Sequence, residues 1–260
     1  RSVARFETAA GQDLGSAQSL LHRCSWPRQM VSLPERRPSS RVLAKEGAAL
    51  VLAARTESDL TSLSEECAKL GPAERVKIFP VDLSEAKGVE DLAAFVLEKC
   101  GGCDVLVNNA GRMGSGNASE GDPDDWDKMM YLNLNGVIRL TRRLTPTMIE
   151  RKWGTVINMG SIAAIEGMSG TAAVYAASKH GLRGWNHSIY QGLRHANVKV
   201  VLINPAFVNT PLVNGNDRLI PERLIQPEDL AEVCLLPFRL TAGCVPSEVT
   251  LRLTLGAFKS

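Results

Sequence analysis

Residues 30–55, MVSLPERRPSSRVLAKEGAALVLAAR, decide how the rest of the chain is interpreted. Their second half contains a helix end stopped by Gly47 and then the unbroken apolar run 48–54, which is typical of a strand buried on both faces of a parallel sheet. Their first half lies where a strand and a glycine-rich turn would have to precede that helix, yet residues 30–40 contain no glycine. The stretch therefore predicts a parallel α/β unit with an unusual beginning.

From residue 42 onward, segments with strand patterns alternate with helical segments. Strands are predicted at 48–54, 76–81, 104–107, 155–159, 198–203 and 247–254, and helices at 57–70, 86–99, 122–150, 172–195 and 227–236. Such an alternation predicts a doubly wound parallel sheet, because right-handed crossovers place helices on both of its faces. We therefore expect one domain over residues 42–260, with its first strand and glycine turn missing or replaced.

Residues 1–41 differ in composition from the remainder of the chain. They carry seven arginines, no lysine, seven serines and three acidic residues, for a net charge of +4. An arginine- and serine-rich, acid-poor start is typical of an organelle transit peptide. A disordered or mis-assigned leader is the other interpretation. We accordingly expect a cytoplasmic protein, or one of a plastid or another organelle if the segment is a transit peptide.

Composition argues against several classes of function. A net charge of +2 over 260 residues does not indicate a nucleic-acid partner, and no apolar run reaches the ~20 residues of a membrane span. Cys100 and Cys103 have the spacing of a zinc or redox motif, but no second pair completes a zinc site. The two glycines between them are ordinary turn chemistry at the end of a helix. We therefore predict no metal site.

Tyr175-Ala-Ala-Ser-Lys179 places a phenol and an ammonium group on one face of a predicted helix, because residues four apart are neighbours there. A free tyrosine has a pKa of about 10 and is a poor acid–base group at neutral pH. A neighbouring cation favours the phenolate and lowers that pKa. The pair is therefore a candidate acid–base group, and a chance pair on a solvated helix face is the alternative.

Two further motifs follow predicted strands, where ligands bind in sheets of this kind. Ser161 could donate a hydrogen bond to a substrate oxygen on which charge develops, and a turn serine is the alternative. The segment Asn108-Asn109-Ala110-Gly111 has small residues that let a ligand approach the backbone, and amides that can tie neighbouring strands together. An ordinary Asn/Gly turn is its alternative.

The order and spacing of these motifs resemble the short-chain dehydrogenase/reductase family. The resemblance covers roughly residues 42–260 and rests on residues 108–111, Asn133, Ser161, Tyr175 with Lys179, and Asn204-Pro205. Within the family the chain looks most similar to 3-oxoacyl-[acyl-carrier-protein] reductases. The resemblance implies a Rossmann-like domain, reduction of a carbonyl to an alcohol with NADP(H), and a homodimer or homotetramer.

The resemblance also implies roles for individual residues. Tyr175 would be the general acid that protonates the carbonyl oxygen, Ser161 would hold that oxygen, and Lys179 would lower the pKa of Tyr175 and bind the nicotinamide ribose. Asn133 would hold a water behind the lysine, with Asn135 as the competing candidate. The other cofactor contacts would be Asp82 and Leu83 at the adenine, Asn108, Asn109, Ala110 and Gly111 along the cleft, and Pro205 and Val208 near the nicotinamide.

Arg55, directly after a predicted strand, bears on the choice of cofactor. An acidic residue at this point accepts hydrogen bonds from the ribose 2′-hydroxyl of NAD. An arginine instead suits the 2′-phosphate of NADP, because its guanidinium forms charge-assisted, bidentate bonds. Arg55 therefore favours NADP(H), and an ordinary solvated charge at a strand end is the alternative.

The chain departs from the family pattern at its beginning. The family has a strand and a TGxxxGxG turn about 24 residues before the position of Arg55, where glycines let the backbone close on the pyrophosphate. Residues 30–37 occupy that place, with Pro34 and Glu35 and no glycine. A displaced turn that begins at Gly11, 44 residues before Arg55, is one alternative. We expect either that the true beginning is replaced or that the chain is a cofactor-deficient, non-catalytic homologue acting as a dimeric scaffold.

Overall fold

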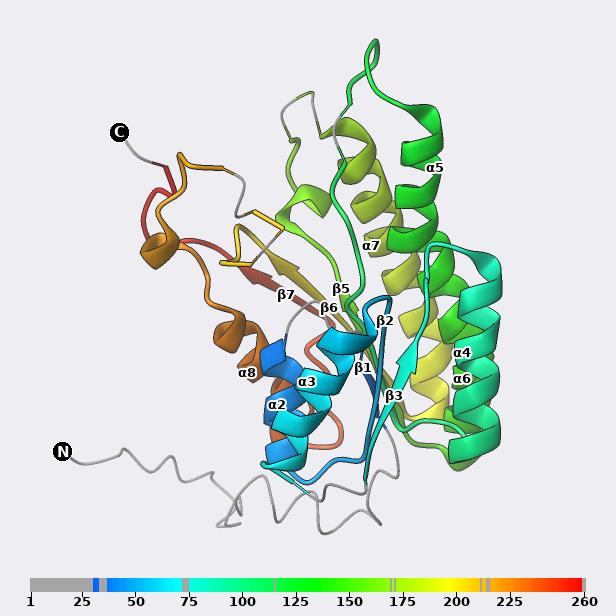
Figure 1. Cartoon of the computed structure of the whole chain (residues 1–260). Helices are drawn as coiled ribbons and strands as arrows, with labels where there is room; N and C mark the ends of the chain where they lie inside the picture. The colour runs from blue at the N-terminus through cyan, green and yellow to red at the C-terminus, as the bar shows by residue number, and fades with distance from the viewer. Residues whose placement is uncertain are drawn as a thin grey trace, which may run out of the picture.

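The computed structural model describes residues 30–32, 37–71, 75–114, 116–168, 170, 172–210, 212–213 and 216–258. Within this part of the chain, seven parallel strands form one sheet in the order β3-β2-β1-β4-β5-β6-β7. Helices cover both faces of the sheet (Figure 1). This arrangement confirms the predicted doubly wound, Rossmann-like α/β fold. None of the described helices is long and apolar enough to cross a membrane.

The elements from residue 42 onward agree closely with the predicted segments. The strands are β1 (Met30–Ser32), β2 (Leu50–Ala54), β3 (Val76–Pro80), β4 (Val105–Asn108), β5 (Gly154–Met159), β6 (Val198–Pro205) and β7 (Glu248–Leu251). The helices are α2 (Arg37–Lys45), α3 (Glu57–Ala68), α4 (Ala86–Cys100), α5 (Pro123–Met130), α6 (Gly136–Arg151), α7 (Ala173–Leu193) and α8 (Pro227–Arg239).

A first strand is present, so of the two expectations for it, missing or replaced, the first is wrong. β1 pairs in parallel with β2, where Met30 lies opposite Leu50, and with β4, where Met30 lies opposite Val105. It therefore lies at the point where the strand order changes direction. Three residues are enough there because strands on both sides supply hydrogen-bonding partners. A segment this short carries no periodicity that a sequence pattern could reveal.

Two of the expectations about the beginning of the chain concern residues outside the described part. These are residues 1–29 of the atypical segment 1–41, with the displaced turn at Gly11, and residues 33–36 of the turn position 30–37. Helix α2 runs across the predicted boundary between residues 41 and 42. Its Ser40 and Leu43 are buried, and Ser39 Oγ lies 4.0 Å from Cys234 Sγ of α8. The helix is thus packed into the domain, and the boundary itself stays a prediction.

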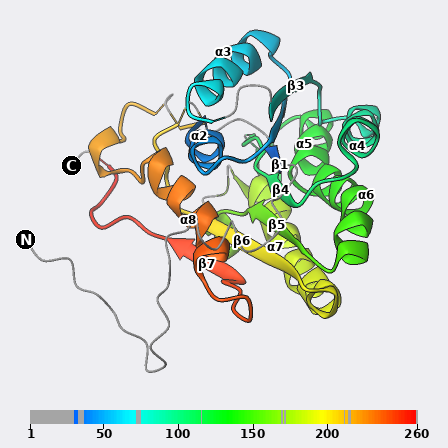
Figure 2. The same cartoon turned by 90° about the horizontal axis from the view of Figure 1, so that it is seen from below.

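The two faces of the sheet carry separate hydrophobic cores, because successive residues of a strand point to opposite faces. Leu50 and Leu52 pack with residues of α2, α3 and α8. Val51 and Ala53 pack with residues of α4 and α6. Figure 2 shows α2, α3 and α8 on one side of the sheet, with α4, α6 and α7 on the other.

The segment predicted as one helix over residues 122–150 is interrupted. Asp122 caps α5 as expected, accepting a hydrogen bond from the backbone N–H of Asp124 at 3.0 Å. One turn of π-helix, Tyr131–Asn135, then joins α5 to α6. Single π turns inside α-helices are frequent at functional sites. Within this turn Asn133 is buried whereas Asn135 is exposed.

Candidate active site

The predicted site residues gather at one edge of the sheet. All strands are parallel, so their carboxyl ends share that edge, and ligands bind there in sheets of this kind. Each predicted position lies at a strand end or on the helix beside it. Arg55 follows β2, Asp82 and Leu83 follow β3, Asn108 ends β4, Ser161 follows β5, Pro205 ends β6, and Tyr175 and Lys179 lie at the start of α7.

Tyr175 and Lys179 are both buried in the first two turns of α7. Lys179 Nζ lies 5.8 Å from the centre of the Tyr175 ring. It also donates a hydrogen bond to the carbonyl oxygen of Met159, the last residue of β5, at 2.8 Å. The two side chains therefore lie close together at the carboxyl end of β5.

Ser161 begins a short 3₁₀ turn, Ile162–Ala164, two residues after β5. Its Oγ accepts a hydrogen bond from the backbone N–H of Ala163 at 3.1 Å. Ala163 packs against Tyr175 in a small buried cluster, which brings the serine turn to the start of α7. Ser161 is thus a turn serine, as the alternative interpretation expected. The Ala163 N–H occupies one lone pair of Oγ, and a serine hydroxyl can donate a hydrogen bond as well as accept one.

Asn133 is 1% exposed and clamps the segment that follows β4. Its Oδ1 accepts a hydrogen bond from the Arg112 N–H, and its Nδ2 donates to the Arg112 carbonyl oxygen, both at 2.9 Å. Nδ2 also donates to Ser178 Oγ at 3.1 Å, and that hydroxyl donates to the carbonyl oxygen of Tyr175 at 2.7 Å. Asn133 therefore joins three segments of the site, whereas Asn135 is exposed.

Gly111 lies between Asn133 and Lys179. A methyl group built on its Cα would lie 3.2 Å from Asn133 Oδ1 and 3.5 Å from Lys179 Nζ. The first distance is tighter than most Cβ contacts, whereas the second is an ordinary van der Waals contact. The glycine keeps the end of the NNAG segment open and lets the amide and the ammonium approach it.

Asn108 ties strands and helices together in the interior. Its Nδ2 donates to Asn158 Oδ1 on β5 at 2.8 Å and to Thr141 Oγ1 on α6 at 3.1 Å. Asn158 Nδ2 in turn donates to Asn186 Oδ1 on α7 at 2.8 Å. Of the two roles considered for these amides, the tie between neighbouring strands is the one that Asn108 fills. Asn109 is also buried, while Ala110 is half-buried.

Arg55 and Asp82 follow the neighbouring strands β2 and β3, and both are exposed. Asp82 Oδ1 accepts hydrogen bonds from the N–H and Oγ of Ser84 at 2.8 and 2.7 Å. Burial works to raise the pKa of Asp82, but the bonds from Ser84 and the charge of Arg55 outweigh it and lower that pKa. A guanidinium thus lies near a stably ionised carboxylate, with Leu83 buried beside them.

Pro205 and Val208 begin the connection between β6 and α8, and both are buried. Val208 pairs with Ile225 in an isolated bridge. The backbone N–H of Ile225 donates to the Phe207 carbonyl oxygen at 3.1 Å, and the Asn209 N–H donates to the Ile225 carbonyl oxygen at 2.9 Å. These two hydrogen bonds therefore hold the base of the connecting loop beside the site.

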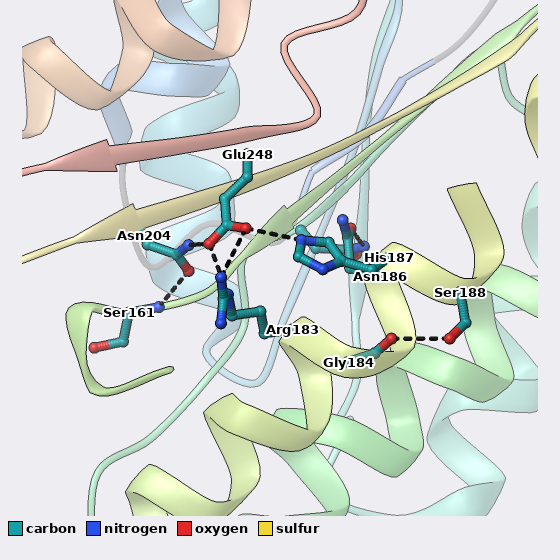
Figure 3. Close-up of polar contacts among 9 residues, drawn as sticks. Ser161, Arg183, Gly184, Asn186, His187, Ser188, Asn204 and Glu248 are labelled. Carbon is teal, nitrogen blue, oxygen red and sulfur yellow. Dashed lines mark hydrogen bonds and ion pairs between the residues drawn. The ribbon is translucent and has the colours of Figure 1, made fainter. Parts of the chain in front are cut away.

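A charged cluster next to Ser161 was not predicted (Figure 3). Asn204 Oδ1 accepts a hydrogen bond from the Ser161 N–H at 3.2 Å, and Asn204 Nδ2 donates to Glu248 Oε1 at 2.7 Å. Arg183 Nε donates to the same carboxylate oxygen at 2.8 Å, and His187 Nε2 lies 2.8 Å from Oε2. Burial works to raise the pKa of Glu248, but Arg183 and His187 outweigh it and lower that pKa.

One signal in the sequence points to part of this cluster. Tyr175, Lys179, Arg183 and His187 recur every four residues, and such a series forms a stripe along one side of a helix. The stripe therefore extends two turns beyond the Tyr–Lys pair. Glu248 has no comparable signal, because its partners lie 61 and 65 residues away in the chain.

Cys100 and Cys103 lie before the amino end of β4, at the opposite edge of the sheet. Gly101 ends α4 with φ 70°, which is the turn chemistry predicted for the glycine pair. Burial raises the pKa of the Cys103 thiol far above its ordinary value, so this thiol is poorly reactive. In the described part of the chain, no three His, Cys, Asp or Glu side chains are grouped so that they could hold a metal ion.

Comparisons with known proteins agree with this fold. The family model described as short chain dehydrogenase matches residues 37–218. An uncharacterized oxidoreductase of Staphylococcus saprophyticus is 32% identical over 214 residues, which cover 81% of this chain and 88% of that protein. One of Staphylococcus aureus is 29% identical over 214 residues, with 81% and 89% covered.

Solved structures are similar over nearly their whole length. A metagenomic short-chain oxidoreductase in complex with NADP has a TM-score of 0.74 and 31% identity, with 88% of this chain and 98% of that chain covered. A variant of actinorhodin polyketide ketoreductase with NADPH has a TM-score of 0.76 and 27% identity, with 86% and 95% covered. The chain belongs to the short-chain dehydrogenase/reductase family of oxidoreductases.

Proposed function

We propose that this protein reduces a carbonyl group to an alcohol with NADPH, and that Tyr175 is the acid. The observation that carries the proposal is the placement of Lys179 Nζ, 5.8 Å from the Tyr175 ring and 2.8 Å from the Met159 carbonyl oxygen. That placement sets a phenol and an ammonium beside the turn of Ser161. The solved relatives that carry NADP and NADPH support the choice of cofactor.

The proposed reaction divides the work among four side chains. When bound, the nicotinamide cofactor supplies the hydride for the carbonyl carbon. Ser161 donates a hydrogen bond to the carbonyl oxygen as negative charge develops there. Tyr175 gives its phenolic proton to that oxygen. Lys179 stabilises the phenolate that remains, and Asn133 holds a water behind the lysine from which the proton is replaced.

The chemistry of the exposed groups fits two parts of NADP(H). The Arg55 guanidinium suits the 2′-phosphate, and the ionised carboxylate of Asp82 can accept a hydrogen bond from the adenine amino group. At the other end of the cofactor, Lys179 can donate to the ribose hydroxyls. The family's pyrophosphate-binding turn corresponds in sequence to residues 30–37, which contain Pro34 and Glu35 and no glycine.

A narrower substrate class is part of the proposal. The likeness to 3-oxoacyl-[acyl-carrier-protein] reductases, together with the polyketide ketoreductase relative, supports a 3-oxoacyl thioester as substrate. We also propose that the protein acts as a homodimer or homotetramer.

The first experiment is a fluorescence titration of the full chain with NADPH, with NADH as the control, followed by NADPH consumption with a short 3-oxoacyl thioester and a simple ketone. We expect saturable binding that prefers NADPH, and consumption that depends on the carbonyl compound. A cooperatively folded chain that binds neither cofactor would overturn the proposal. The absence of glycine from residues 30–37 would then favour the dimeric scaffold.

A further inference from the structure

We propose that Glu248 is a positioning residue, which acts through Asn204 to fix Ser161 relative to the helix that carries Tyr175 and Lys179. The inference rests on the proposed function, since it takes Ser161 as the group that holds the substrate oxygen. The side-chain hydrogen bonds of Glu248 go to Asn204, Arg183 and His187. Its effect on the reaction would pass through the hydrogen bonds that connect it to both sides of the site.

The first connection runs from the carboxylate to the serine turn (Figure 3). Glu248 Oε1 accepts from Asn204 Nδ2 at 2.7 Å, and Asn204 Oδ1 accepts from the Ser161 backbone N–H at 3.2 Å. Because the carboxylate takes the amide hydrogen of Asn204, the amide oxygen is turned toward Ser161. The acceptor at Glu248 and the donor at Ser161 together fix the orientation of this side chain.

The second connection runs from the same carboxylate to α7. Arg183 donates to both oxygens of Glu248, through Nε at 2.8 Å and Nη2 at 3.3 Å, and His187 Nε2 lies 2.8 Å from Oε2. Arg183 is one helical turn beyond Lys179, and two-point contact between a guanidinium and a carboxylate restricts both groups. Glu248 therefore joins the end of β6 to the helix that carries the acid.

Close packing around Asn204 supports a positioning role. Asn204 is fully buried. A methyl group built on Gly160 would lie 2.0 Å from Asn204 Oδ1, so a side chain at position 160 would displace the amide. Glycine thus lets the amide approach the backbone immediately before Ser161. The contact leaves little room for Asn204 to adopt another orientation.

A positioning residue is expected to change the rate more than the binding. Displacement of a catalytic group by 1 Å can cost about 100-fold in rate. Glu248→Gln keeps the size of the side chain but removes the charge that holds Arg183 and His187. We expect kcat to fall about 10-fold or more, with the Kd for NADPH and the KM for substrate changed less than about twofold.

The matched control is Glu232→Gln. Glu232 forms an ion pair with Arg239 on α8, at 2.5 Å and with exposed side chains, outside the candidate site. We expect this variant to leave kcat, KM and the Kd for NADPH unchanged. A comparable loss of kcat in both variants would mean that removing any carboxylate charge has this effect, which would overturn the proposal.

The route through Ser161 is tested by a double-mutant cycle. Glu248→Gln is introduced into the wild-type chain and into Ser161→Ala, and the two changes in kcat are compared. We expect the substitution to lower kcat much less in the Ser161→Ala background. Equal changes in both backgrounds would show that Glu248 does not act through Ser161.

A second readout needs no turnover, so it separates failure of this inference from failure of the proposed function. Amide hydrogen exchange at Ser161, followed by NMR in the full chain, reports the bond to Asn204. We expect Glu248→Gln to speed this exchange about 10-fold or more, and Glu232→Gln to leave it unchanged. Unaltered exchange at Ser161 in Glu248→Gln would overturn the inference, whether or not the protein reduces carbonyl compounds.

Discussion

Lys179 Nζ donates a hydrogen bond to the carbonyl oxygen of Met159 at 2.8 Å, and this contact ties the second turn of α7 to the end of β5. Met159 lies two residues before Ser161, and Lys179 lies four residues after Tyr175. One polar contact therefore joins the strand that delivers the proposed hydrogen-bond donor to the helix that delivers the proposed acid.

Lys179→Met should lower kcat about 100-fold, because it removes the cation that stabilises the phenolate of Tyr175. It should also weaken NADPH binding. Lys199→Met is the matched control, since Lys199 Nζ donates to the carbonyl oxygen of Pro237 at 2.7 Å, away from the site. Steady-state kinetics and NADPH titration compare the two variants. Similar losses of kcat would contradict a specific role for Lys179.

Tyr175→Phe should lower kcat by about 100-fold or more, because the proton donor is removed. Tyr190→Phe makes the same chemical change further along α7, where Arg194 lies over the ring at 5.9 Å. We expect the control to keep full activity. Both variants should unfold cooperatively near the wild-type temperature, as measured by circular dichroism. Undiminished turnover in Tyr175→Phe would remove it from the mechanism.

Arg55→Gln should weaken NADPH binding about 10- to 100-fold, because charge-assisted hydrogen bonds to the 2′-phosphate are lost. NADH lacks that phosphate and serves as the internal control, so its Kd should stay the same. Fluorescence titration gives the Kd for NADPH and the Kd for NADH, and their ratio shows whether Arg55 binds the 2′-phosphate. A ratio unchanged by the substitution would mean that Arg55 is a solvated charge at a strand end.

Gly88→Ala should destabilise the fold by about 1–3 kcal/mol, because the added methyl overpacks a filled space. The new carbon would lie 1.9 Å from the carbonyl oxygen of Asp82, so it would displace the turn proposed to bind adenine. NADPH affinity should fall as well. Gly192→Ala is the control, because Gly192 in α7 has open space where the methyl group would lie. This substitution should stabilise the fold by about 0.5–1 kcal/mol. Urea unfolding of both variants measures whether the free energy of unfolding falls in Gly88→Ala and rises in Gly192→Ala.

Glu248→Gln should make the free energy of unfolding less dependent on acid pH. The folded-state pKa of Glu248 is lowered, so its ionised form contributes stability that is fully present above the unfolded pKa. That contribution is lost as the pH falls through the lowered folded value. Urea unfolding at several pH values should show that the difference in the free energy of unfolding between the variant and wild type shrinks below about pH 4. A difference that stays constant with pH would show that the carboxylate charge is not its cause.

Most of the fold, and the shared helix face of Tyr175 and Lys179, could be predicted from local patterns. The apolar run at residues 48–54 and its successors predicted the strands of a parallel sheet, because burial on both faces selects such runs. The spacing of four between Tyr175 and Lys179 predicted their shared face, because helix geometry is local. Family membership followed from the order of such motifs and is confirmed by the match to residues 37–218.

The sequence by itself therefore determined which side chains are available and along which elements they lie. Tertiary structure decided the place of β1, whose three residues hold the centre of the sheet through bonds from β2 and β4. It also decided the π turn that buries Asn133, and the meeting of Glu248 with Arg183 across 65 residues of chain. These features depend on partners that are distant in sequence, so no local pattern of residues could specify them.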